Sequence, residues 1–402
     1  MTNNKDKKVL NVPNLRFPEF TGEWKKCIIG ELTIKVGSGV TPRGGETVYK
    51  SEGHPFVRSQ NVGLGHLILD DIAYIDEDTH QRQKNTELQL DDVLLNITGA
   101  SIGRSALVNQ QIVGGNVNQH VCIIRANKKL IPSFLCNFLL SQYGQKQIES
   151  FQAGGNRQGL NFEQIKSIKI GLPSVEEQKK IADLLLLIEQ RITTQNKIIE
   201  KLKSLIKGLN NILLYGTEGK SVCLGDILLE RSERSRTNNQ HEVLSSTVKG
   251  IFSQREYFSK DIASENNVGY KIIRLHDVVL SPQNLWMGNI NYNDRFEIGI
   301  VSPSYKVFSI ADGFDNQFVA AMLKSHRALY SYIMVSEQGA SIVRRNLNME
   351  AFSQLVFKIP SLDKQREIGY EISLLKSQLK TANKIIRAYT SQKQYLLRQM
   401  FI

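Results

Sequence analysis

The sequence has few cysteines and prolines, and their positions exclude several kinds of site. The nine prolines include no Pro-Pro pair, which excludes the Asn- or Asp-Pro-Pro-aromatic motif of an adenine methyltransferase. So few cysteines in 402 residues favour a reducing compartment. A zinc site has no support, because the cysteines form no CxxC pair and no histidine stands at ligand spacing beside any of them: Cys27, Cys122, Cys136 and Cys223.

The sequence also lacks long apolar runs, and it lacks further catalytic motifs. The most apolar run, Leu184 to Ile188, is far shorter than a membrane span, and the N-terminus lacks the apolar stretch of a signal peptide. The seven histidines show no HExxH pattern. Residues 219–221 end like a phosphate loop, but Leu214 stands where the earlier glycine should be. We therefore expect a cytoplasmic protein without catalytic residues, metal or cofactor of its own.

Positive charge is in excess. Lys and Arg outnumber Asp and Glu by 51 to 39, which gives a formal net charge of +12 and a pI near 9.4. This balance favours an anionic partner, such as nucleic acid or a membrane surface. The hydrophobic fraction of 41% is enough for packed cores, and the length suggests two or three domains.

An internal duplication is the most informative feature of the chain. Residues 160–214 align without gaps with residues 347–401 at an offset of 187, with 15 identities in 55 positions. Weaker echoes lie upstream, where Asp92 begins a short run that resembles the run at Asp277. The globular parts have diverged by insertion and deletion, while the tails have not. Two copies suggest pseudo-twofold symmetry rather than a solenoid.

Each repeated tail carries a heptad seam, which predicts a long helix. The steps alternate four and three, and such a narrow apolar stripe needs a partner helix to cover it. We expect two helices of about 38 residues, each roughly 55–60 Å long, in an antiparallel intramolecular coiled coil. Two ordinary core helices of a larger α/β domain are the alternative. The seams are Ile181, Leu185, Ile188, Ile192, Gln195, Ile199, Leu202, Ile206, Leu209 and Leu213, then Ile368, Ile372, Leu375, Leu379, Ala382, Ile386, Tyr389, Lys393, Leu396 and Met400.

The remaining segments predict two mixed α/β (α+β) domains. An arm over 1–16 precedes the first domain at 17–159, and the second domain lies at 217–346. The tails occupy 160–216 and 347–402. Short β-rich runs predict strands, and one helix is expected near 133–151 with a counterpart near 315–336. The predicted strands are 92–97, 120–124, 271–275 and 305–310.

Several loops in both domains mix glycine with arginine, asparagine, glutamine and serine. Arginine can read guanine, and asparagine or glutamine can read adenine, through paired hydrogen bonds, while the same groups also grip phosphates. Plain surface loops favour the same residues, so the pattern alone leaves both interpretations open. The DNA-binding candidates are Arg43, Arg58, Gln60, Asn61, Ser101, Arg104, Asn156, Arg157, Gln158, Asn284, Trp286, Arg344 and Arg345.

Apolar residues also lie off the seam of the tails. They widen the apolar surface beyond what a two-helix contact needs, which favours partner helices that pack on this spine. The partner-binding candidates are Leu184, Leu187, Ile198 and Ile212.

Taken together, the chain resembles the specificity subunits of type I restriction–modification systems. The resemblance rests on the opening at 12–24, on residues 55–62 and 96–103, and on the motif at 172–182 with its repeat at 359–369. The second half departs from it, because residues 283–288 replace the Thr-Gly-x-Ser-Ile-Gly of residues 98–103. In such a subunit the two globular segments would be target-recognition domains.

The resemblance implies a function and a set of partners. The chain would recognise a split, asymmetric site in double-stranded DNA, with the helices as a spacer. Two methylation subunits carrying S-adenosylmethionine would methylate adenine at N6, and two translocase–nuclease restriction subunits would use ATP and Mg. Three alternatives stay open: a stand-alone DNA-binding or coiled-coil scaffold protein without a methylation partner, a single-chain enzyme such as a nuclease, and a membrane-surface coiled coil.

Overall fold

The computed structural model describes residues 10–152, 159–215, 219–257, 266–338 and 345–402. The chain forms two compact units. Unit 1 comprises residues 1–196 and 384–402, and unit 2 comprises residues 197–383. Each unit therefore contains one globular region together with part of both long tails.

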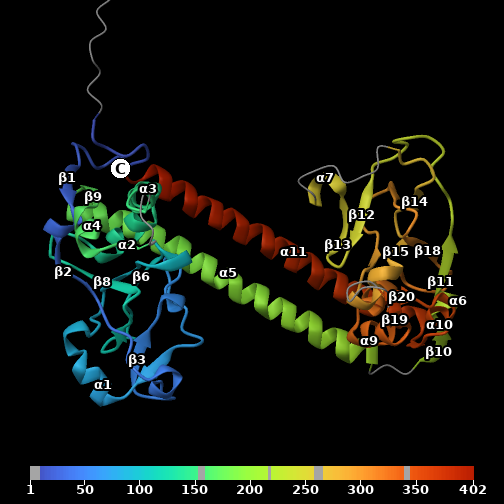
Figure 1. Ribbon diagram of the computed structural model, residues 1–402. Coiled ribbons are helices and arrows are strands. Elements are labelled where there is room, and N and C mark those ends of the chain that lie inside the picture. The colour runs from blue at the N-terminus through green and yellow to red at the C-terminus, as the bar shows by residue number, and fades with distance from the viewer. Residues whose placement is uncertain (1–9, 153–158, 216–218, 258–265, 339–344) are drawn as a thin grey trace, which may run out of the picture. The chain divides into compact units, whose positions relative to one another are not determined.

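Unit 1 is built around a four-stranded antiparallel sheet in the order β2-β8-β5-β6. A smaller sheet has the order β4-β3-β7, and β1 pairs with β9. The helices α2 to α4 gather with β1 and β9 at one end of the unit, and α1 lies with β3 at the other (Figure 1). The elements are β1 (Lys25–Ile28), η1 (Ile29–Leu32), β2 (Thr33–Ser38), η2 (Gly45–Val48), β3 (His54–Val57), η3 (Ser59–Asn61), β4 (Ala73–Ile75), α1 (Glu77–Arg82), η4 (Lys84–Thr86), β5 (Val93–Asn96), η5 (Gly99–Ser101), β6 (Ser105–Leu107), β7 (Asn116–Val117), β8 (Val121–Ala126), α2 (Pro132–Leu140), α3 (Gln142–Ser150), α4 (Phe162–Ser167), β9 (Lys169–Leu172) and the start of α5 (Val175–Tyr215).

The position of the central strand β5 explains why its sequence is apolar at successive positions. Val93 and Leu95 point into a core shared with the helices, whereas Leu94 points into a second core on the side of the smaller sheet. Both faces of the strand are buried, so alternation with polar residues is absent. The predicted strands at 92–97 and 120–124 are confirmed as β5 and β8.

Unit 2 repeats this plan with the sheet order β11-β18-β15-β16. Val278 and Leu280 face the helical core, and Val279 faces the opposite one, as in β5. The predicted strands at 271–275 and 305–310 are confirmed as β14 and β18. The elements are β10 (Lys220–Cys223), α6 (Leu224–Ile227), β11 (Leu228–Arg231), β12 (Leu244–Thr247), β13 (Gly250–Ser253), α7 (Gln254–Tyr257), β14 (Lys271–Arg274), β15 (Val278–Leu280), η6 (Pro282–Met287), β16 (Ile290–Tyr292), β17 (Ile298–Val301), β18 (Lys306–Ile310), α8 (Asn316–Leu323), α9 (His326–Met334), β19 (Ser336–Gln338), β20 (Arg345–Leu347), α10 (Met349–Ser353), β21 (Val356–Ile359) and the start of α11 (Leu362–Gln399).

The single helices expected near 133–151 and 315–336 are each two helices, and this prediction was wrong. Ser141 is extended and its hydroxyl accepts from the Gly144 amide, so it caps α3 after α2 has ended. Ser325 does the same for α9, accepting from the Ala328 amide. A serine cap inside an apolar run starts a new helix in another direction, which apolar spacing alone does not reveal.

A buried glutamine fixes each tail helix to its globular region. Gln178 accepts from the Ile131 amide (2.8 Å), just before α2 begins. Gln365, its counterpart at the offset of 187, accepts from the Asp315 amide (2.9 Å), just before α8 begins. Both glutamine side chains are buried. The Gln of the repeated motif therefore sets the angle at which each long helix leaves its unit.

The arm before β1 is also fixed to the start of α5. Arg16 donates to both carboxylate oxygens of the buried Glu177 (2.7 and 2.8 Å), and Trp24 Nε1 donates to the same group (3.2 Å). A buried carboxylate needs such partners. The opening motif of the sequence therefore serves to fold unit 1.

The two long helices form as predicted, and α5 and α11 run antiparallel within unit 1. Glu189 forms an ion pair with Lys393, and Arg191 donates to the Tyr389 hydroxyl (3.3 Å), so the residue numbers rise along one helix as they fall along the other. The seam residues whose side chains are described are buried or half-buried. Within the described residues, no helix is long and apolar enough to span a membrane.

Candidate nucleic-acid interface

Two of the predicted loops of unit 1 and the start of the first tail meet where β5 ends. Asn96 is fully buried there, and its side-chain amide donates to the carbonyl of Ser59 (2.8 Å). Its backbone amide donates to the carbonyl of Arg104 (2.9 Å). Leu160 donates to the carbonyl of Ile97 (2.9 Å), which brings the start of the first tail to the same place. The end of one sheet strand therefore holds together loops that are far apart in the sequence.

A chain of polar side chains extends from this point to the loop that carries Arg43. The Thr98 hydroxyl lies 2.6 Å from His120 Nδ1, and Gln119 Nε2 lies 3.0 Å from His120 Nε2. The Gln119 carbonyl oxygen then accepts from the Thr41 amide (3.0 Å). Sequence reasoning missed Gln119 and His120 as site residues. The signal for them was the polar run at 118–120 directly before the apolar strand β8.

The described arginine candidates of unit 1 differ in whether other side chains or carbonyls already bind them. Arg43 and Arg104 are exposed and form no ion pair among the described residues. Arg58 is held instead, because it donates to the carbonyl of Asp71 (2.7 Å) and its guanidinium lies 5.6 Å from the centre of the Tyr49 ring. Of these three, Arg43 and Arg104 present an unpaired cation to a phosphate or a base.

The neighbouring candidates are divided in the same way. Gln60 is exposed but donates to the Asp71 carboxylate, and Ser101 is half-buried at the end of η5. The prediction that Asn61 contacts DNA was wrong. It is fully buried, accepts from the Arg58 amide (3.0 Å) and donates to the carbonyl of Ile68 (2.9 Å), so its amide shapes the loop and cannot reach a base.

In unit 2 two predicted loops come together at the equivalent position. The helix η6 follows β15 as residues 97–104 follow β5, and β20 packs against it. The Arg345 guanidinium lies 4.6 Å from the centre of the Trp286 ring, a cation–π contact. Asn284 is half-buried in the same turn, which ends at Gly288 in the left-handed conformation (φ 85°). Arginine side chains can hydrogen-bond to guanine, and aromatic rings can stack on unpaired bases.

Residues 232–240 of unit 2 were missed by the sequence reasoning. They follow β11 as the Arg43 loop follows β2, and a cavity of about 560 Å³ is lined there by Glu233, Arg234, Ser235, Arg236, Gln240 and Ile272. The signal was the arginine-rich run at 231–236. Four predicted residues, Asn156, Arg157, Gln158 and Arg344, lie outside the described residues.

The predicted partner-binding residues of the tails are only partly exposed. Leu187 and Ile198 are exposed, at 57% and 42%. Leu184 is half-buried against the helical core of unit 1, so that prediction is corrected: the side chain supports the fold. The side chain of Ile212 lies outside those described.

Three exposed positions on one face of each tail helix carry the same residue in both tails. Leu187, Thr194 and Ile198 recur as Leu374, Thr381 and Ile385 at the offset of 187. Spacings of seven and four place three residues on one face of a helix. All six side chains are exposed, so their identity is not explained by packing of the fold.

Two of the four cysteines, Cys122 and Cys136, are buried in the core of unit 1. Burial raises the pKa of the Cys122 thiol to about 12 and that of Cys136 to about 11, and thiols with such values are poor nucleophiles. No group of three or more His, Cys, Asp or Glu side chains that could hold a metal ion occurs in the described part of the chain.

Comparisons with known proteins agree with this duplicated architecture. Residues 21–204 match the family described as "Type I restriction modification DNA specificity domain". The S subunit of a type I restriction–modification system from M. genitalium has the same fold, with a TM-score of 0.62 at 15% identity over 97% of this chain and 99% of that one. In sequence over residues 21–204, and in fold over nearly its whole length, the chain is similar to type I restriction–modification specificity subunits.

Two further relatives define the extent of this likeness. The MjaVIII specificity subunit of Methanocaldococcus jannaschii is 24% identical over 217 residues, 48% of each chain. A solved structure concerned with complex assembly and conformational transition of the type I R-M system matches 93% of this chain and 96% of that chain, with a TM-score of 0.52 and 15% identity. In sequence, the chain spans about half the length of the curated relatives it matches, 47% and 48%.

Proposed function

We propose that this chain is a type I restriction–modification specificity subunit that binds double-stranded DNA at a split, asymmetric site, with one half-site read by each unit. The observation that carries the proposal is the contrast between frame and loops. The frame is the same in both units, since the sheet orders β2-β8-β5-β6 and β11-β18-β15-β16 correspond. The loops after β5 and β15 differ, with Thr98-Gly99 in one and Trp286 in the other. One frame with two sets of loops suits two different half-sites.

The contacts within each loop set indicate how the bases would be read. In unit 1 the exposed Arg43 and Arg104 would contact phosphates or guanine, beside the Thr98–His120–Gln119 chain. In unit 2 the Arg345–Trp286 pair would contact a base edge or a phosphate. Because the polar side chains bond to one another before DNA arrives, little ordering would be required on binding.

We further propose that two methylation subunits bind the tails and methylate an adenine at N6 in each half-site. The repeated exposed faces support this stoichiometry, because Leu187 and Ile198 in one tail correspond to Leu374 and Ile385 in the other. Two equal faces suit two equal partners. Each target adenine would be flipped out of the stack into a methylation subunit. The specificity subunit would act without a catalytic site of its own.

The cofactors would accordingly reside on the partners. S-adenosylmethionine would be held by the methylation subunits, and ATP with Mg by two translocase–nuclease subunits that join for restriction. The long helices would set the distance between the half-sites. Lengthening both helices by one heptad would then lengthen the spacer of the recognised site, and an unchanged spacer would contradict this role.

The first experiment is a single-molecule methylome of the host with and without the gene. Loss of one split N6-methyladenine motif on deletion is the expected result, and it identifies the target. Complementation of the deletion with Arg345→Ala should then lower sequence specificity only in the half-site that unit 2 reads. The discrimination in binding free energy at the affected base should fall by about 1–3 kcal/mol. Arg82→Ala, which removes an exposed arginine from α1, is the matched control and should leave the motif unchanged.

A stand-alone DNA-binding or coiled-coil scaffold protein is the second candidate. It would leave the methylome unchanged on deletion while the purified chain still bound DNA. The exposed apolar identities of the two tails favour the complex, because a scaffold without partners gains nothing from Leu187 and Leu374 in water.

A further inference from the structure

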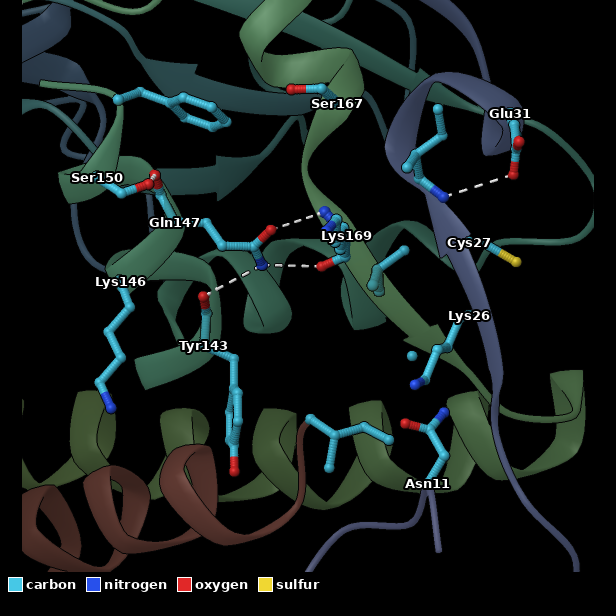
Figure 2. A pocket seen from close by; sticks show the side chains of 15 residues that line it. Asn11, Lys26, Cys27, Glu31, Tyr143, Lys146, Gln147, Ser150, Ser167 and Lys169 are labelled. Atoms are coloured by element: carbon cyan, nitrogen blue, oxygen red, sulfur yellow. Dashed lines mark hydrogen bonds between the residues drawn. The ribbon is translucent and has the colours of Figure 1, made fainter. Parts of the chain in front are cut away.

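Unit 1 contains a cavity of about 970 Å³ at the end where its short helices gather. Figure 2 shows Lys146 of α3 and Lys26 of β1 on opposite sides of it, with Tyr143 between them. The floor is largely apolar, and the rim carries ammonium groups. The lining residues are Asn11, Lys26, Cys27, Ile28, Glu31, Tyr143, Lys146, Gln147, Ser150, Phe151, Ser167, Lys169, Ile170, Gly171 and Ile402.

The three lysines of this cavity form no ion pair among the described residues. Lys26, Lys146 and Lys169 lie on three separate elements, β1, α3 and β9. The one acidic side chain of the lining, Glu31, is turned to the Ile28 amide at 3.5 Å. The cavity therefore has an excess of positive charge that the surrounding described side chains leave uncompensated.

The wall formed by β9 is held in place by the chain's own hydrogen bonds. Gln147 accepts from the Lys169 amide (2.8 Å) and donates to the Lys169 carbonyl (2.9 Å), as a neighbouring strand would. Its amide also donates to the carbonyl of Tyr143 (3.3 Å). Figure 2 shows these bonds joining α3 to β9. A preformed wall lowers the entropy cost of binding.

The lysines are particular to unit 1. In the aligned elements of unit 2, Ser221 stands for Lys26, Tyr330 for Lys146 and Val356 for Lys169. Tyr330 and Val356 are 65% and 50% exposed, so the equivalent surface of unit 2 is uncharged at these positions. Arg327 and Lys358 stand instead for Tyr143 and Gly171, so unit 2 keeps two cations there but at other positions, and the arrangement of the three lysines belongs to unit 1.

The chemistry of the cavity limits what could occupy it. The chain's own first eight residues carry three lysines and one aspartate, so they would be repelled. A DNA backbone would use the lysines but leave the apolar lining of Ile28, Phe151 and Ile402 uncovered. An acidic segment with an apolar side chain satisfies both features.

We propose that this cavity, the lysine pocket, binds a short segment of a partner protein in which acidic side chains flank an apolar one. The apolar side chain lies on the floor, and carboxylates reach Lys26 on one wall and Lys146 and Lys169 on the others. None of its lining residues is a described DNA-binding candidate or part of the repeated exposed faces of the tails, so the proposal does not depend on the proposed function.

The test uses the full chain and a fluorescein-labelled peptide, Glu-Phe-Glu-Leu-Glu-Gly. Two control peptides are used, one with every Glu replaced by Gln and one with Phe and Leu replaced by Ser. Anisotropy should show saturable binding that weakens with salt and is roughly tenfold weaker for either control peptide. The variant Lys26→Glu/Lys146→Glu/Lys169→Glu should weaken binding roughly tenfold or more, because attractions become repulsions.

A control with the same charge change separates the pocket from general charge. Lys50→Glu/Lys128→Glu/Lys179→Glu reverses three exposed lysines of unit 1 that do not line the pocket and should leave peptide binding unchanged. Ile28→Ser, which alters only the apolar lining, should weaken binding without changing its salt dependence.

Each contrary result overturns the proposal in a recognisable way. Equal loss in both triple variants, equal binding of the Gln control peptide, or no saturable binding at all would show that the pocket does not select such a segment. Loss of duplex DNA binding in the pocket variant alone would assign the lysines to phosphates. A change in sedimentation of the pocket variant alone would assign the cavity to a second copy of the chain.

Discussion

Replacing the buried glutamine of each tail motif tests whether it fixes the long helix to its unit. Gln178 makes three hydrogen bonds, to the Ile131 amide at 2.8 Å and to the carbonyls of Lys129 and Pro173, each at 3.1 Å. Leucine keeps the volume but leaves the Ile131 N–H buried without an acceptor. An unsatisfied buried donor costs about 1–3 kcal/mol, and the two lost bonds add about 1 kcal/mol each. Because the site can partly relax, Gln178→Leu should destabilise unit 1 by about 2–4 kcal/mol.

The internal repeat supplies a second copy of the same experiment. Gln365 makes two hydrogen bonds, to the Asp315 amide at 2.9 Å and to the carbonyl of Pro360 at 3.0 Å. Because Gln365 makes one bond fewer, Gln365→Leu should lower the free energy of unfolding by about 1.5–3 kcal/mol, and the loss should appear in unit 2 rather than in unit 1.

Urea unfolding followed by circular dichroism measures the size of each effect, and amide hydrogen exchange locates it. Protection should fall around 129–140 for Gln178→Leu and around 314–323 for Gln365→Leu. Gln190→Leu, an exposed change on the same helix, should stay within about 0.5 kcal/mol. A loss below about 0.5 kcal/mol for Gln178→Leu, or equal loss of protection in both units from either variant, would refute the reasoning.

Three further changes test other parts of the structure. Gly39→Ala should destabilise by about 2 kcal/mol or more in thermal unfolding, because the new Cβ would overlap the carbonyl oxygen of Val117. Gly37→Ala, which meets nothing within 4 Å, should be neutral or slightly stabilising. Arg16→Ala strands the buried carboxylate of its partner and should cost about 3 kcal/mol in urea unfolding. Burial and a neighbouring ammonium lower the pKa of Lys324 to about 8, so the stability of the wild type relative to Lys324→Met should rise between pH 8 and about 10.5.

The sign of the last prediction follows from proton binding. Between the folded pKa of about 8 and the unfolded value near 10.5, the unfolded chain holds more protons at Lys324, so raising the pH favours the folded state. A flat or falling difference would contradict it. Equal stability of the Gly39→Ala and Gly37→Ala variants would contradict the predicted overlap with Val117. Full rescue of Arg16→Ala by salt would contradict the role of the buried ion pair.

The sequence by itself determined the elements whose signal is periodic or repeated. The seam from Ile181 onward specified α5, and its repeat from Ile368 specified α11, because a heptad pattern over five repeats fits only a helix paired with another. The apolar run at 92–97 specified the central strand β5. The offset of 187 predicted the duplicated architecture, because two segments with the same apolar pattern bury it in the same way.

Tertiary structure alone decided which polar residues of the loops are free. Arg43 and Asn61 both looked like contact residues, but one is exposed and the other is buried in its own loop. His120 was missed, although it joins two of the loops. Loop composition favours polar residues whether they bind DNA or hold the loop, and only the fold says where each side chain points.

The lysine pocket illustrates the same limit. Lys26, Lys146 and Lys169 are 120 and 23 positions apart in sequence and follow no motif. The pairing of β1 with β9, and the packing of α3 against them through Gln147, place the three ammonium groups around one cavity. Periodicity acts within one element, whereas a site depends on contacts between elements, so the sequence specified the frame and the tertiary structure assembled the sites.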